Sequence, residues 1–324
     1  MNILLLTPKL NDYHVDIEEN LKSKGHSVKW YCSNQVGNNL DKLLNRIDQN
    51  YLINKFDKYI ESIITDNKEI EFDKVLLIFG GNNFRKKHVC ALRNAFKRAE
   101  FIYYNWDSIV NYPEIKNFYK EFDRYYSFDQ DDCNKYGFSF LPLFYCNQYE
   151  NVEPIYDLFT IMSYSANKER GYKSIKKVLP DNLKVVEYLY TPNRIKIIID
   201  EILKKSYLTS ISFNKLHFKP MHRNEVYKMI QKSRVVLDTP RENQNGLTMR
   251  TFETLNQHRK LITTNANIKK YEFYCEDNVY VVDSKSKNIP LDFFTKPFNS
   301  KFKLDKKYSL DAFLDKIILE EVGF

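Results

Sequence analysis

Residues 2–32, NILLLTPKLNDYHVDIEENLKSKGHSVKWYC, predict the first building block of the fold. The apolar run 2–8 is typical of a buried strand, and residues 16–24 are typical of a helix that ends at Gly25. The alternating run 26–32 predicts a second strand. A strand, a helix and another strand in this order form a βαβ unit, in which the two strands are parallel.

The same alternation continues along the 324 residues. Further strands are expected at 72–79, 101–106, 124–128, 158–163, 183–189, 216–218, 235–238, 260–264 and 279–283, with helices between them that include 40–65, 168–179, 195–205 and 248–256. A polar stretch at 146–154 interrupts the pattern and predicts a domain boundary. We therefore expect an α/β protein with two parallel-sheet domains, 1–150 and 151–308, and a closing helical segment, 309–324.

Composition excludes several classes of protein. With 43% hydrophobic and 28% charged residues, the chain can bury large cores and is not disordered. It has no apolar run of the roughly 20 residues that a membrane span needs. The apolar start of the chain does not resemble a signal peptide, and the five cysteines form no C-x-x-C motif, so we expect a cytoplasmic protein with reduced thiols. The net charge of +8 suits an anionic partner without identifying it.

The segment 244–253, QNGLTMRTFE, is the most informative one for function. It follows a predicted strand, and Gly246 allows a turn before a helix begins near Thr248. Backbone N–H groups at a helix start attract phosphate oxygens, and Arg250 adds a fork of donors suited to a diphosphate. Glu253 could accept two hydroxyl groups of a ribose. The alternative is a capped helix in which Arg250 and Glu253 form a surface ion pair.

Three other stretches place polar residues after predicted strands. In SYSANKER, residues 163–170, Ser165 could cap a helix and Arg170 could reach a ligand. Asp107 follows another strand and could act as a general base, or it could cap the short helix after it. His14 lies near Asp12 after the first strand, where it is either a base or an ordinary polar surface residue.

Several motifs carry weaker signals. Asp129 and Asp131 spell the D-x-D of some metal-dependent sugar transferases, but helix capping by Asp129 is the favoured interpretation. A basic helix at 84–98 predicts either a solvated face or a patch for anionic lipid headgroups. No dinucleotide-binding, P-loop or nucleic-acid-binding motif occurs, so a basic nucleic-acid binder ranks last and no nucleic-acid partner is expected.

Taken together, QNGLTMRTFE and KLITTN (260–265), with WDS (106–108), SFDQDD (127–132) and LPLFY (141–145), resemble bacterial GT-B glycosyltransferases of lipopolysaccharide and capsule assembly, loosely the CgeB-like group. The resemblance implies two facing Rossmann-like domains, with a C-terminal helix that crosses back to the first. It also implies a nucleotide-sugar donor held by the second domain. Residues that match donor-site positions are Arg170, Thr248, Arg250 and Glu253, with Lys219 as a looser match; Ser165 and Gln244 complete the expected donor site.

This resemblance implies a glycosyltransferase that extends a surface glycan without a metal or other cofactor. Asp107, or else His14, would deprotonate the acceptor hydroxyl if the reaction inverts the sugar. The acceptor would be a glycan or a lipid-linked glycan, reached by peripheral docking on the inner face of an anionic membrane. The alternative is a nucleotide-sugar or glycan binding module without catalysis.

Overall fold

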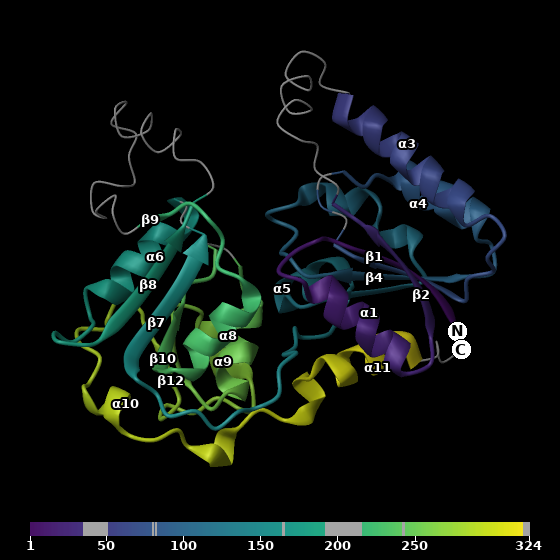
Figure 1. The fold of residues 1–324 in the computed structure, drawn as a ribbon. Helices are drawn as coiled ribbons and strands as arrows, with labels where there is room; N and C mark the ends of the chain where they lie inside the picture. Colours follow the sequence, from purple (N-terminus) through teal and green to yellow (C-terminus); the bar gives the residue numbers. More distant parts are fainter. Residues whose placement is uncertain are drawn as a thin grey trace. The chain divides into compact units, whose positions relative to one another are not determined.

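The computed structural model describes residues 1–34, 51–79, 81, 83–163, 166–191, 216–241 and 244–319. The chain divides into two compact units, Met1–Pro142 with Leu310–Phe324, and Leu143–Ser309 (Figure 1). The expected helix 195–205 and the first part of the expected helix 40–65 lie outside the described residues. Among the described helices, none combines the length and the apolar composition needed to cross a lipid bilayer.

The first unit is built on a six-stranded sheet in the order β2-β1-β3-β4-β5-β6, and each neighbouring pair is parallel. The strands are β1 (Asn2–Thr7), β2 (Ser27–Cys32), β3 (Lys74–Ile78), β4 (Glu100–Asn105), β5 (Arg124–Ser127) and β6 (Ser139–Phe140). The chain runs outward from β1 to β2 and then returns to the other side of β1 with β3. The order of the strands therefore reverses between β1 and β3, and loops after strands diverge at such a point.

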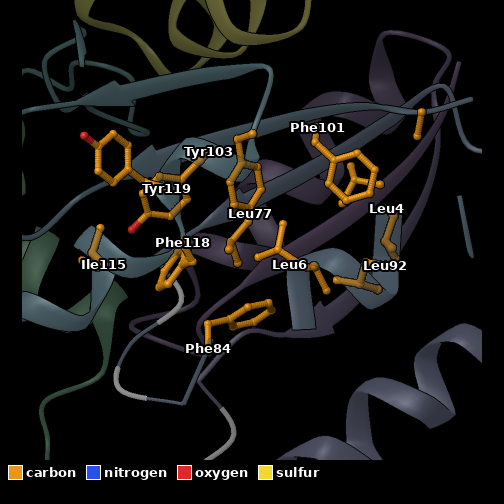
Figure 2. Close-up of a cluster of buried hydrophobic side chains, with 14 of the residues drawn as sticks. Leu4, Leu6, Leu77, Phe84, Leu92, Phe101, Tyr103, Ile115, Phe118 and Tyr119 are labelled. Carbon is orange, nitrogen blue, oxygen red and sulfur yellow. The ribbon is translucent and has the colours of Figure 1, made fainter. Parts of the chain in front are cut away.

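Aromatic side chains dominate the core on one face of this sheet (Figure 2). Side chains alternate between the two faces of a strand, so Leu4 and Leu6 of β1 point to the same face as Leu77 and Tyr103 of the neighbouring strands. Helices and short 3-10 turns surround the sheet: α1 (Tyr13–Ser23), α3 (Tyr51–Asp66), α4 (Lys86–Ala95), η1 (Pro113–Asn117), η2 (Tyr119–Glu121) and α5 (Gln130–Tyr136). Helices α3 and α4 contribute Phe56, Ile60, Val89 and Leu92 to this core, which is why their apolar residues recur at helical spacing.

The last helix of the chain, α11 (Leu310–Leu319), belongs to the first unit rather than to the second. The ring of Phe313 packs edge-on against Tyr104 of β4, with ring centroids 4.7 Å apart. The ammonium group of Lys24, just after α1, lies 2.8 Å from a carboxylate oxygen of Asp311 and also pairs with Asp315. The predicted return of the closing helix to the first domain is therefore confirmed.

The second unit repeats the same plan. Its six parallel strands lie in the order β12-β11-β10-β7-β8-β9. They are β7 (Tyr156–Ser163), β8 (Val185–Tyr190), β9 (Leu216–His217), β10 (Ser233–Asp238), β11 (Lys260–Thr263) and β12 (Val279–Val281). Here the strand order reverses between β7 and β10. The predicted α/β class, with two parallel sheets, is thus confirmed.

Both faces of this second sheet are covered. The helices are α6 (Ala166–Lys176), α8 (Arg223–Gln231), α9 (Met249–Asn256) and α10 (Asp292–Thr295), with 3-10 turns η5 (Ala266–Lys270), η6 (Ser300–Phe302) and η7 (Lys306–Tyr308). Val235 packs in one core cluster with Tyr172 and Ile175 of α6, and the next residue, Val236, packs in another with Val226 and Ile230 of α8. Burial on both sides explains why the strands read as continuous apolar runs.

The polar stretch before β7 is hydrogen-bonded to residues at the C-terminal end of α9. The Asn256 amide donates to the carbonyl of Asn147 at 2.6 Å, and the Gln257 amide donates to the carbonyl of Gln148 at 2.7 Å. The Gln257 side-chain oxygen accepts the backbone N–H of Glu150 at 3.2 Å. The entry of the chain into the second sheet is therefore held by α9.

Candidate functional site

The candidate donor site lies at the carboxyl ends of β7 and β10, where the strand order of the second sheet reverses. Gly171 of α6 shows that the segments after β7, β10 and β11 meet there. A Cβ atom on Gly171 would come 3.4 Å from Thr264 Oγ1 and 3.6 Å from the Thr239 methyl group. Ligands of open parallel sheets bind outside the carboxyl ends at such a reversal, so this edge is where a ligand is expected.

The loop between β10 and α9 is held in place by one buried amide. The Asn265 Nδ2 group donates to the carbonyls of both Asn245 and Gly246 at 3.2 Å. Its side-chain oxygen accepts the N–H of Asn267, so the same amide also caps η5. Gln244 adds a bond from its Nε2 to the Gly246 carbonyl at 3.3 Å. A loop with its carbonyls fixed in this way presents the start of α9 in one position.

Helix α9 begins where the sequence predicted. Thr248 is the N-cap, and its hydroxyl accepts the N–H of Thr251 at 3.3 Å. The same hydroxyl donates to Asp238 Oδ2 at the end of β10, at 2.5 Å. Both hydrogen bonds of the Thr248 hydroxyl thus position the helix. They do not involve the backbone N–H of Thr248, which is the group expected to bind a phosphate.

Arg250 and Glu253 form part of a chain of polar groups between α9 and α8. Arg250 Nη1 lies 2.8 Å from Glu253 Oε2, and the Tyr227 hydroxyl donates to Glu253 Oε1 at 3.1 Å. Arg223 Nε in turn donates to the Tyr227 hydroxyl at 2.8 Å. The Glu253 side chain is only 1% exposed, so this is a buried pair and not the surface pair considered from the sequence.

The electrostatics of this chain of polar groups keep the Tyr227 hydroxyl protonated. Burial, and next the negative charge of Glu253, raise the pKa of Tyr227 well above its ordinary value, so its hydroxyl remains a donor. Both carboxylate oxygens therefore accept hydrogen bonds. Each oxygen can accept a further hydrogen bond, but the Glu253 side chain is only 1% exposed, so a ribose would need room that these partners now occupy.

The other predicted donor residues fall in different places. Arg170 lies in the first half of α6, after β7, and its side chain is outside the described part of the structure, as is Ser165. Lys219 is exposed and follows β9, which β8 separates from β7. Its carbonyl accepts the Tyr188 hydroxyl at 2.8 Å. The structure brings Gln244, Thr248, Arg250 and Glu253 together in the loop after β10 and in α9. Lys219 lies on a different segment, between β9 and α8.

The predicted catalytic residues lie on the first unit, at the carboxyl edge of its sheet. The loop after β1 and the end of β3 contain non-glycine residues with left-handed backbone: Asn11 (φ 46°), Asp12 (φ 57°) and Phe79 (φ 49°). For a bulky residue such as Phe79 this conformation is strained, and such strain concentrates at functional sites.

His14 occupies the first turn of α1 next to these residues. It is buried, and its ring packs against Trp30 with centroids 4.5 Å apart. Burial lowers its pKa below the usual 6.5, although Asp12 acts in the opposite direction, so the imidazole is mainly neutral at pH 7. Within the described residues, its Nδ1 atom has no hydrogen-bond partner.

Asp107 holds the turn that follows β4, but it does not cap the next short helix, η1, whose N-cap is Tyr112. Asp107 Oδ1 accepts the backbone N–H of Ser108 and the amide of Asn111, each at 2.9 Å. The preceding Trp106 contacts Tyr13 edge-on at 6.4 Å between ring centroids. Because Tyr13 precedes His14, this contact brings the two segments that carry the predicted bases to one edge.

The D-x-D motif caps a helix, as favoured from the sequence. Asp129 Oδ1 accepts the N–H of Asp131 at 3.0 Å, and Asp129 Oδ2 bonds the Ser108 hydroxyl. Asp132 Oδ2 accepts the N–H of Ile109 at 2.8 Å. In the described part of the chain, no group of three His, Cys, Asp or Glu side chains is arranged to hold a metal.

Sequence reasoning missed four residues that shape these sites: Gly171, Tyr227, Asp238 and Asn265 in its anchoring role. A glycine inside a predicted helix is a signal for close packing, and Gly171 carried that signal. Asn265 stands in the KLITTN motif, but only the fold shows which carbonyls it reaches. Tyr227 had no sequence signal, because its contact with Glu253 joins two helices.

Replacement of Asn265 by Asp tests the anchored loop. The variant keeps the oxygen that caps η5 but turns the two donors to Asn245 and Gly246 into acceptors, so we expect a loss of about 1–3 kcal/mol in unfolding free energy. Urea denaturation measures the loss. Asn267→Asp is the matched control and should cost less, because its amide donates only to the Asn245 side chain. Equal stability of Asn265→Asp and the native protein would contradict the anchoring role.

The pH dependence of stability tests the environment of Asp132. Burial, with the nearby Asp129, Asp131 and Asp107 acting in the same direction, raises the pKa of Asp132 from 3.8 to about 6. As the pH rises, the unfolded chain therefore releases this proton first, and the free energy of unfolding should fall by about 2 kcal/mol between pH 4 and pH 6. In Asp132→Asn, which retains an acceptor for Ile109, this contribution should disappear.

Thermal or urea unfolding from pH 4 to pH 7 compares the two proteins. Asp66→Asn, at an exposed position that is not among the groups acting on Asp132, serves as the control and should keep the native pH dependence. The same slope in Asp132→Asn as in the native protein would refute the assignment.

Comparison with solved structures identifies the fold of the chain. No protein-family model and no curated protein matches the sequence. The solved structure of the Anabaena protein Alr3699/HepE in complex with UDP and glucose does match, with a TM-score of 0.51 and 12% identity over 98% of this chain and 95% of that chain. Its complex with UDP-glucose matches with a TM-score of 0.51 and 10% identity over the same shares. The chain therefore has the two-domain GT-B architecture that its sequence predicted.

Proposed function

We propose that the protein is a glycosyltransferase that moves a sugar from a nucleoside-diphosphate sugar to a glycan acceptor. The observation that carries the proposal is the fixed start of α9 at the β7/β10 reversal, with Arg250 in its first turn. The Anabaena protein of the same fold was crystallised with UDP and glucose and with UDP-glucose, which supports this choice of donor class.

The chemistry required of the donor site is stabilisation of a leaving group. As the bond between sugar and diphosphate breaks, negative charge grows on the diphosphate oxygens. Backbone N–H groups at the start of α9, the helix dipole and the Arg250 guanidinium offer positive charge at that place. Arg170, which begins the helix after β7, would add a second guanidinium. These groups supply what a metal ion supplies in other transferases, so we propose a metal-independent reaction.

Glu253 has two possible roles at this site, and the contacts favour one for the protein without ligand. Its carboxylate holds Arg250 at 2.8 Å and fixes the direction of the guanidinium. On donor binding, the ribose hydroxyls would replace the Tyr227 hydroxyl at Oε1, which retains the pairing with Arg250. Gln244 would remain a loop residue that shapes the same edge.

We assign deprotonation of the acceptor hydroxyl to a residue of the first unit. Asp107, or else His14, would take the proton of the attacking hydroxyl, because both belong to segments at the carboxyl edge of that sheet. The turn contacts of Asp107 use Oδ1, and the substitution Asp107→Asn preserves an acceptor there. The substitution therefore tests the carboxylate charge of Asp107 while the hydrogen bonds of the turn are kept.

The resemblance to the CgeB-like group and to lipopolysaccharide and capsule enzymes narrows the proposed acceptor to a bacterial surface glycan, free or lipid-linked. Peripheral binding at the inner membrane face belongs to the same proposal. The basic helix gives it little support, because Lys86, Lys87, Arg93 and Arg98 pair with Glu121, Asp57, Asp123 and Glu71.

Calorimetric titration with UDP, GDP, CDP and CMP, followed by transfer assays with the donor identified, tests the proposed function; no binding of any nucleotide would reject it.

The non-catalytic alternative, a nucleotide-sugar or glycan binding module, gains support from the turn contacts of Asp107, which need no catalytic role. Release of free nucleotide distinguishes the two functions. A transferase consumes the donor when the acceptor is added, whereas a binding module leaves the donor intact.

Arg250→Ala should lower turnover by about 10²-fold or more, as loss of one preorganised charge-stabilising donor does. The assay follows nucleotide release with EDTA present, so that metal-independent catalysis is measured. Arg234→Ala removes an exposed arginine of β10 and is the matched control. A folded Arg250→Ala protein with near-native turnover would exclude the proposed role.

Asp107→Asn should lower kcat by about 10²-fold or more while the folded structure is kept, because general-base catalysis contributes factors of this size. The measurement is kcat/KM between pH 4 and pH 8 for Asp107→Asn, His14→Gln and the native enzyme. Loss confined to His14→Gln would transfer the role to His14. Native rates in both variants would show that neither residue is the base.

A further inference from the structure

The second unit contains a pocket of about 370 Å³ beside β12, the edge strand of its sheet. Lys260, the first residue of β11, forms part of its lining with Tyr274, Tyr280 and Phe293. The proposed donor site lies at the opposite, carboxyl ends of the strands. The volume falls in the range of small-molecule sites, about 300–1,000 Å³.

Lys260 is the unusual group in this pocket, because the whole residue is only 3% exposed. Its ammonium group donates to the carbonyl of Phe293 at 3.0 Å and lies 4.9 Å from the centroid of the Phe293 ring. Within the described residues, no carboxylate lies at ion-pair distance from it. A protonated lysine has three donors, and these contacts satisfy one of them fully.

An ammonium group buried without an anionic partner destabilises the fold, because no charge of opposite sign offsets the loss of its hydration. The cost appears as a lowered pKa of Lys260, caused first by its burial, while Asp277 and Asp292 oppose the change from a greater distance. Neither carboxylate is drawn to Lys260: Asp292 pairs with Lys296 at 2.5 Å, and Asp277 accepts the Asn299 amide at 2.9 Å. Among the described residues, then, no carboxylate neutralises Lys260, and this leaves room for an anion from outside the chain.

We propose that this pocket binds a small ring-bearing carboxylate, whose carboxylate pairs with Lys260 while its ring packs against the aromatic walls. A single negative charge matches a single buried ammonium. The lining as a whole sets Lys260, Lys269 and Lys296 against Glu276, Asp277 and Asp292, so a phosphate dianion would add twice the uncompensated negative charge that a carboxylate adds. The volume exceeds what an ion such as acetate fills, and the flat faces of Tyr274, Tyr280 and Phe293 suit a sugar ring or an aromatic ring.

The first experiment compares acids with neutral amides of the same shape by calorimetry of the full-length protein. The probes are glucuronate against glucuronamide, and benzoate against benzamide, which separate a sugar acid from an aromatic acid. One of the two acids should bind at least tenfold more tightly than its amide, as expected for a charge-assisted hydrogen bond. Equal affinity within both pairs, or no binding of either acid at about 10 mM, would overturn the proposal.

The second experiment replaces the ammonium. Lys260→Met keeps the volume and removes the charge, so the preference for the acid should vanish, while Lys301→Met, an exposed lysine outside the pocket, should retain it. Without ligand, Lys260→Met should melt at a higher temperature than the native protein, because an unpaired buried charge is gone. If Lys260→Met does not fold, a crystal structure of the native protein with the bound acid decides: a carboxylate distant from Lys260 Nζ would refute the site.

Discussion

The parallel arrangement of the strands decides where a ligand can bind in each sheet of this protein. All strands of a sheet end at the same edge, and the loops that follow them separate only where the strand order reverses. In the second unit that place lies between β7 and β10. Everything proposed for the donor depends on it: the loop fixed by Asn265, the helix capped by Thr248, and the guanidinium directed by Glu253. The first unit obeys the same constraint, and its strained residues Asn11, Asp12 and Phe79 cluster at the corresponding edge.

Local pattern was sufficient to predict the fold class. The run at 2–8 became β1 (Asn2–Thr7), and the helix start near Thr248 was placed correctly because an N-cap is written in two or three adjacent residues. Boundaries were less well determined. The strand expected at 72–79 is shorter in the structure, where β3 spans Lys74–Ile78 and Phe79 already has a left-handed backbone.

The polar contacts of the sites were harder to predict, for a physical reason. Arg250 and Glu253 are neighbours on one helix, so their pairing was foreseeable, but its burial depends on Tyr227 from α8. Lys260 looked like an ordinary charged residue at the start of a strand. Its enclosure depends on Phe293, which is far away in sequence and reaches the strand only through the three-dimensional fold. A pattern of residue types contains no information about such long-range partners.

The position of α11 in the sequence has a consequence for how the protein is made. The first unit needs Phe313 against Tyr104 and Asp311 beside Lys24, but a ribosome delivers these residues only after the whole second unit has been synthesised. Domains generally fold as they emerge, N-terminal first. Here the earlier half leaves the tunnel with the surface around Tyr104 uncovered, and that surface stays open to chaperones until α11 has been synthesised.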